Sequence, residues 1–101
     1  MELVVEDNPD RSRYEAHADG EFAGYVAYHL SQNDIAFTHT ETEPRFQGKG
    51  IAGRLVGSVL DDAAARGLGV LPFCPFVRGW LDKHPDYVKL VPEERRAEFR
   101  L

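Results

Sequence analysis

The sequence has one cysteine, no long hydrophobic run and no excess of basic residues, and each lack excludes a class of protein. Cys74 alone cannot form an internal disulfide, which excludes a disulfide-stapled secreted fold and predicts a reducing, cytoplasmic location. No apolar segment approaches the roughly 18 residues that a membrane-spanning helix needs. The acidic start Met1-Glu2-Leu3 is not typical of a signal peptide, so no membrane partner is expected.

The charge balance is acidic overall but basic in one place. Twelve lysines and arginines against 17 acidic residues give the 101-residue chain a net charge of −5. Binding to nucleic acid depends on many contacts between basic side chains and phosphates, so a nucleic-acid partner is disfavoured. Residues 45–54 nevertheless contain Arg45, Lys49 and Arg54 and no acidic residue. A local anion-binding site is therefore compatible with the acidic composition.

Length and hydrophobic patterning predict a single domain over residues 1–101 with a mixed α/β fold. In the first half, alternation and turn residues predict strands that would form an antiparallel meander: residues 3–5, 12–18, 21–30 and 35–42. In the second half, apolar residues recur at helical spacing over residues 51–66, and a short apolar strand follows at 69–73. This order predicts a β-α-β crossover that places the fifth strand parallel to the fourth.

Two shorter helices are predicted near the end of the chain. Pro75 suits the first position of a helix, and Pro85 disfavours helical geometry at the residue before it. The helix between them is expected to carry four apolar side chains toward the core: Phe76, Val77, Trp80 and Leu81. A last helix is expected to start at Pro92.

The segment before the long helix has the composition of an anion-binding loop. It reads Arg45-Phe46-Gln47-Gly48-Lys49-Gly50-Ile51-Ala52. The first amides of a helix have no internal partners, and the helix dipole attracts anions to that end. Glycines at spacing two allow close approach to the backbone, and Lys49 can neutralise a bound phosphate. A Walker motif is excluded because no Lys-Ser/Thr pair follows the glycines, and a dinucleotide fingerprint is excluded because its third glycine is missing.

The order of a strand, an R-x-x-G-x-G loop, a helix and a strand resembles the pyrophosphate loop of the GCN5-related N-acetyltransferases. His39-Thr40, Cys74-Pro75-Phe76-Val77 and His84-Pro85-Asp86-Tyr87 are similar to the small single-domain branch of that superfamily, over essentially the whole chain. The resemblance implies acetyl-CoA as the acyl donor, with the acetyl group between residues near His39 and Cys74. It also implies that the pyrophosphate is bound by the loop: Arg45, Gln47, Gly48, Lys49, Gly50, Ile51 and Ala52.

His39 and Glu41 are candidate catalytic residues. Strand parity predicts that both share the face of Ile35 and Phe37. A histidine beside an acid could act as the general base that deprotonates an ammonium acceptor. The alternatives are a structural histidine bonded to the backbone and a solvated glutamate at a strand end. Thr40 is expected to pack or to contribute backbone groups.

Cys74 is the third candidate. It immediately precedes the helix predicted from Pro75, where the dipole would favour a thiolate, so it could accept the acetyl group as a nucleophile. The alternatives are an inert packed thiol and direct transfer to the amine. Larger family members carry a tyrosine about two turns into this helix, whereas this chain has Trp80 and Leu81 there. No histidine has metal-ligand spacing, so no metal site is predicted.

The predicted function is acetyl transfer from acetyl-CoA to an amine such as a lysine side chain, a polyamine or a small amine, by a monomer or weak homodimer. The negative net charge weakly favours a cationic acceptor. An alternative is a non-catalytic CoA-binding or acyl-CoA-binding module that acts as a sensor or interaction partner. The missing helix tyrosine favours this module, and the position of Cys74 favours the enzyme. A protein-interaction domain without cofactor affinity is a third possibility, which the Arg45-x-x-Gly48-x-Gly50 motif opposes.

Overall fold

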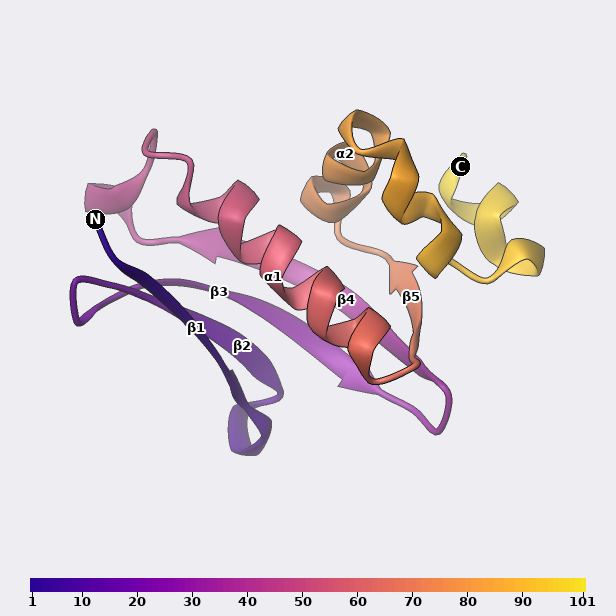
Figure 1. The fold of residues 1–101 in the computed structure, drawn as a ribbon, viewed down its shortest axis with the longest axis horizontal. Coiled ribbons are helices and arrows are strands. Elements are labelled where there is room, and N and C mark those ends of the chain that lie inside the picture. Colours follow the sequence, from indigo (N-terminus) through magenta and orange to yellow (C-terminus); the bar gives the residue numbers. More distant parts are fainter.

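A computed structural model describes residues 1–101 as a twisted five-stranded sheet with α-helices packed on one face (Figure 1). The strands are β1 (Leu3–Asn8), β2 (Arg13–Ala18), β3 (Glu21–Leu30), β4 (Asp34–Thr42) and β5 (Gly69–Pro72). The α-helices are α1 (Ile51–Ala65) and α2 (Pro75–Lys83). Short 3₁₀ segments complete the chain at Pro9–Arg11, Pro44–Phe46, Pro85–Leu90 and Glu93–Phe99. No helix has both the length and the apolar character needed to cross a bilayer.

The strands lie in the order in which they occur along the chain. The pairs β1·β2, β2·β3 and β3·β4 are antiparallel, and β4 pairs with β5 in parallel over Phe37 and the three residues before it. Because α1 connects β4 to β5, this confirms the predicted meander and β-α-β unit, and with them the mixed α/β class. The last predicted helix is a 3₁₀ segment that begins at Glu93 rather than at Pro92.

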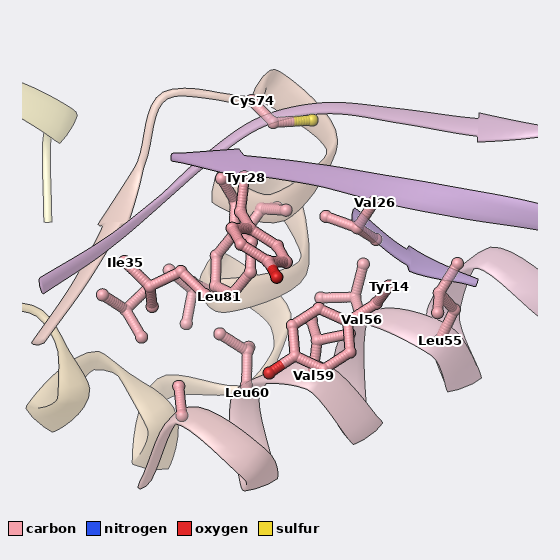
Figure 2. Close-up of a cluster of buried hydrophobic side chains, with 14 of the residues drawn as sticks. Tyr14, Val26, Tyr28, Ile35, Leu55, Val56, Val59, Leu60, Cys74 and Leu81 are labelled. Atoms are coloured by element: carbon pink, nitrogen blue, oxygen red, sulfur yellow. The ribbon is translucent and has the colours of Figure 1, made fainter. Parts of the chain in front are cut away.

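The core lies between the sheet and the two α-helices. Leu55, Val56, Val59 and Leu60 of α1 are fully buried against Val26 of the sheet and its neighbours (Figure 2). Leu81 brings α2 into the same cluster of 21 buried residues. Burial of this stripe, at about 25 cal/mol for each Å² of apolar surface, is the main force that holds α1 on the sheet.

Polar contacts at the margin of the core fix the second half of α1. The Tyr14 hydroxyl donates to Asp62, and Arg66 donates to the Tyr14 oxygen at 3.1 Å. The Tyr28 hydroxyl donates to Asp7 at 2.6 Å. Burial, and then the bond to Asp7, raise the pKa of Tyr28 to about 12, so the hydroxyl stays a donor at neutral pH. The contacts of Tyr14 attach the end of α1 to β2, and the bond between Tyr28 and Asp7 joins β3 to β1.

Small residues let α1 and α2 approach closely. A Cβ atom on Gly57 would lie 3.3 Å from the Trp80 ring, so the indole packs directly on the backbone of α1. Of the four side chains predicted to point into the core from α2, Val77 and Leu81 are buried and Trp80 is half-buried. The prediction for Phe76 is wrong, because this side chain is 44% exposed.

Two β-bulges change which side chains share a face. The register of β2 and β3 shifts at Ala23, which has no partner in β2. Phe22 therefore pairs with His17 and lies on the opposite face of the sheet from Val26. The register of β3 and β4 shifts at Thr38, because Tyr28 pairs with Phe37 while the preceding residue of β3 already pairs with His39. An extra residue reverses the side-chain alternation beyond it. The parity predicted for β4, which places His39 and Glu41 on the face of Phe37, is therefore wrong beyond Thr38.

The close approach of β3 to β4 predicts a stability difference between two glycine substitutions. A Cβ on Gly24 would lie 2.5 Å from the Glu41 carbonyl oxygen, so Gly24→Ala should destabilise the protein by about 1–3 kcal/mol. Gly79 in α2 has open space around it, and Gly79→Ala should stabilise the helix by up to about 1 kcal/mol. Urea unfolding measures both, and equal midpoints for the two variants would contradict the close approach.

Candidate functional site

The loop before α1 exposes a run of unpaired backbone amides. None of the amides of residues 48–53 donates a hydrogen bond within the chain, and the first paired amide is that of Arg54, which bonds the Gly50 carbonyl at 3.3 Å. Gly48 and Gly50 have φ of 79° and 76°, and nothing lies within 4 Å of where their Cβ atoms would be. A positive φ favours glycine and turns successive amides toward a common side. The arrangement is an open anion cradle.

Side chains on both sides hold this loop and supply its charge. Gln47 donates from Nε2 to the Thr42 carbonyl at 3.3 Å, which attaches the loop to the end of β4. The Arg45 guanidinium forms an ion pair with Glu21 at the exposed rim. Lys49 forms no ion pair, so its charge is available to a ligand. Among the seven predicted cofactor residues, Ile51 has its side chain buried in the core and contributes through its amide.

Two hollows meet at the loop. The smaller, of about 250 Å³, lies between the loop, the end of β4 and α2. The larger, of about 900 Å³, is a groove between α1 and α2 that extends to Trp80 and His84, whose rings stack at 3.7 Å. Both are lined by Gly50, Gly53 and Phe76. Phe76 is therefore a wall of the hollows rather than a core residue.

The strands β4 and β5 separate just beyond Phe37. Their parallel pairing ends at Phe37 and Pro72, and the last backbone bond between the two segments runs from the Cys74 amide to the Phe37 carbonyl at 2.9 Å. Cys74 Sγ lies 3.3 Å from Thr40 Oγ1, and the residue Cys74 is only 3% exposed. Thr40 therefore faces Cys74 with its hydroxyl, a contact that depends on the bulge at Thr38 and has no signal in the sequence pattern.

The bulge places His39 and Glu41 on the other face of the sheet. The prediction that they share the buried face of Phe37 is wrong, because their side chains are 59% and 60% exposed. His39 Nε2 lies 3.1 Å from Glu41 Oε2, so the two do form the predicted pair. The pair and Cys74 consequently lie on opposite sides of β4. No cluster of three or more potential metal ligands is present.

Tyr25 belongs to the same exposed group, and sequence reasoning missed it. Its hydroxyl donates to Glu41 Oε2 at 2.9 Å, because the β3·β4 register places the two residues opposite each other. This hydrogen bond, followed by that from His39, lowers the pKa of Glu41. Glu41 is thus an ionised carboxylate at neutral pH.

A comparison with protein families identifies the family to which this chain belongs. A model described as GCN5-related N-acetyl-transferase matches residues 13–90, which is well over half of the chain. The chain belongs to this family. The predicted family and fold class are confirmed, and the family is one of N-acetyltransferases. No curated protein matches the chain in sequence.

Two solved structures have a similar fold. One is a GCN5-like protein of Staphylococcus aureus assigned as an N-acetyltransferase, with a TM-score of 0.62 and 20% identity over 89% of this chain and 88% of that one. The other is ribosomal-protein-alanine N-acetyltransferase of Brucella melitensis biovar Abortus 2308, with a TM-score of 0.56 and 22% identity. The match covers 79% of this chain and 61% of the Brucella chain, so this protein spans about three-fifths of that length. At these identities the likeness concerns the fold, and the roles of the site residues stay predictions.

The burial of Cys74 predicts a slow thiol. Because Sγ is enclosed beside Thr40, a thiol reagent such as Ellman's reagent should react far more slowly with native protein than with protein unfolded in urea. Release of the coloured thiolate measures both rates. Equal rates in the two states would contradict the enclosed position.

Proposed function

We propose that this protein transfers the acetyl group of acetyl-CoA directly to an amine. The observation that carries the proposal is the run of six unpaired amides, residues 48–53, at the start of α1 and beside a large groove. An anion with several oxygens, such as a pyrophosphate, is the ligand that such a cradle fits. The single cluster of 21 buried residues also supports the proposal that residues 1–101 act as one domain.

The residues present fit CoA. The amides of the loop would donate to the pyrophosphate oxygens, and the absence of Cβ atoms at Gly48 and Gly50 allows the contact. Lys49 and Arg54 would offset the phosphate charge, because neither is engaged in an ion pair. The groove between α1 and α2 starts at the same glycine, Gly50, and is large enough to hold the nucleotide part. When bound, acetyl-CoA supplies a thioester whose carbonyl carbon is electrophilic.

The exposed His39–Glu41 pair is the proposed proton acceptor. An alkylammonium acceptor must lose a proton before its nitrogen can attack a thioester. With Nε2 directed at Glu41, the other ring nitrogen of His39 is available to take that proton. The face on which the pair lies has no helix above it, so a lysine side chain, a polyamine or a small amine can reach it. The net charge of −5 favours a cationic acceptor.

The surroundings of Cys74 favour direct transfer of the acetyl group to the amine over a route through an acetylated cysteine. The thiol is almost fully enclosed, and its polar contact is the hydroxyl of Thr40, which is not a base at neutral pH. A nucleophilic cysteine needs a partner that removes its proton, and the histidine of the site lies on the other face of β4. Cys74 is therefore proposed as part of the wall where β4 and β5 separate.

The composition of α2 favours a second candidate, a module that binds CoA without turnover. A departing thiolate needs a proton donor, and the residues of α2 two turns beyond Cys74 are Trp80 and the buried Leu81. Neither carries a hydroxyl. In this alternative the protein binds an acyl-CoA as a sensor or as an interaction partner.

Binding of CoA through the loop predicts a difference between two glycine variants. Gly48→Glu places a carboxylate in the anion cradle and should abolish stabilisation by CoA, which at 100-fold excess over Kd is about 2.7 kcal/mol, or more than about 10 °C in Tm. Gly67→Glu is the matched control, because Gly67 has a similar φ of 70° and open space, at the far end of α1. It should retain the full shift. Equal CoA shifts in the two variants would rule out the loop as the pyrophosphate site.

Turnover separates the two candidate functions. Wild-type protein should release CoA thiol from acetyl-CoA in the presence of at least one class of amine: lysine peptides, polyamines or small amines. Cys74→Ala should keep this activity, and mass spectrometry should find no acetyl adduct on the wild-type cysteine. If wild-type protein instead carries an acetyl adduct on Cys74, and Cys74→Ala loses both the adduct and turnover, the route through Cys74 replaces direct transfer. CoA binding with no acceptor-dependent release would instead support the non-catalytic module.

A further inference from the structure

Two side chains on the helix-free face converge on one carboxylate oxygen of Glu41. Tyr25 donates from Oη to Glu41 Oε2 at 2.9 Å, and His39 Nε2 lies 3.1 Å from the same atom. The rings of Tyr25 and His39 have their centroids 6.0 Å apart and are tilted by 57°. Glu41 thus bridges the histidine of β4 to the tyrosine of β3.

The strand register produces this convergence. Glu41 lies directly opposite Tyr25, and His39 lies opposite Ala27, one pair further along the same face. Because Ala27 is small, it leaves the space beside His39 free for the ring of Tyr25 to approach diagonally. The arrangement requires the bulge at Thr38, since without it His39 and Glu41 would point toward α1.

Tyr25 is itself held from the opposite side. The Arg13 guanidinium lies over the Tyr25 ring at 4.5 Å, and Arg13 Nε is 2.7 Å from Glu15 Oε2. The side chains of Arg13 and Glu15 are much less exposed than those of His39 and Glu41. Tyr25 therefore connects a half-buried pair on β2 to a more exposed pair on β4.

We propose that Tyr25 is a positioning residue for acetyl transfer, whose hydroxyl holds Glu41 in the orientation that directs His39 toward the acceptor amine. Two exposed side chains would otherwise sample several rotamers, which weakens most surface ion pairs. The bond from Tyr25 restricts the carboxylate, and the carboxylate then keeps Nε2 of His39 as its donor. The proposal rests on the proposed function, because it gives His39 the task of taking the acceptor's proton.

The charge states at neutral pH suit this role. The bond to Glu41 raises the pKa of Tyr25, so the phenol keeps its proton. The same bond lowers the pKa of Glu41, so the carboxylate stays ionised. The charged and titratable groups that adjoin His39 are Glu41 and Tyr25, and Arg13 lies beyond the Tyr25 ring.

The first test uses a spectroscopic signature that does not depend on activity. In Tyr25→Phe the aromatic ring and its contact with Arg13 remain, but the donor to Glu41 is lost. The carboxyl carbon of Glu41, followed by NMR as pH is varied, should then titrate closer to the ordinary glutamate value than in wild type. Glu98 is the internal control, because its pKa is lowered by Arg95 at the other end of the chain. An unchanged Glu41 titration would overturn the proposal.

The second test measures coupling in turnover. Tyr25→Phe should lower kcat by about 2- to 12-fold, the range of one net hydrogen bond, without changing the KM for acetyl-CoA. Glu41→Gln should lower kcat at least as much, and the double variant should be no slower than Glu41→Gln alone, because Tyr25 acts only through Glu41. Glu98→Gln should turn over like wild type. Additive losses in the double variant, or full activity of Tyr25→Phe, would overturn the role of Tyr25.

The failure of this proposal differs from the failure of the proposed function. A wild-type protein that releases no thiol with any amine overturns the transferase assignment, and with it a positioning role for Tyr25. An active wild type whose Tyr25→Phe variant shows neither the NMR change nor the loss of kcat overturns the role of Tyr25 alone.

Discussion

The interruption of β4 at Phe37 and Thr38 is the constraint on which the rest of the site depends. Up to Phe37 the strand pairs with β3 on one side and β5 on the other. Beyond it, β5 departs into α2 and the bulge at Thr38 reverses the side-chain alternation. One local irregularity therefore opens the sheet, turns Thr40 toward Cys74 and sends His39 to the helix-free face.

A second feature is the way an acidic protein offers a site for an anion. The net charge of −5 acts over long distances and is screened by salt, whereas the free amides of residues 48–53 act at hydrogen-bond distance. Backbone donors at the start of a helix do not depend on the count of lysines and arginines. Under the proposed function, the same molecule would bind phosphates at its loop and favour a cationic acceptor over its general surface.

The two sides of the sheet have different tasks under the proposed function. The helix side carries the loop, the groove between α1 and α2 and the enclosed thiol, all suited to a large cofactor. The other side carries the exposed group Tyr25, His39 and Glu41, which has room for an acceptor. The cofactor and the acceptor would meet where β4 and β5 separate, because the strands are paired elsewhere and the two sides of the sheet are connected at this point.

Most elements of the fold could be predicted because their signals are local. Alternation in residues 12–18 and the apolar stripe of α1 depend on residues close together in the chain, and both match the structure. Phe76 shows where this fails. Its apolar character predicted burial, but the space between the loop and α2 leaves it as a wall of two hollows, and only the packing of distant segments creates that space.

The sequence alone determined the loop, its glycines and the helix that follows. A left-handed φ and the free amides at the start of a helix depend only on residues that are close together in the chain. The tertiary structure decided the direction of the side chains on β4. A bulge forms when two strands pair out of step, and its position depends on contacts between β3 and β4 that no local pattern encodes. That is why His39 and Glu41 were identified as a pair but assigned to the wrong face, and why Thr40 and Tyr25 were given no role in the chemistry.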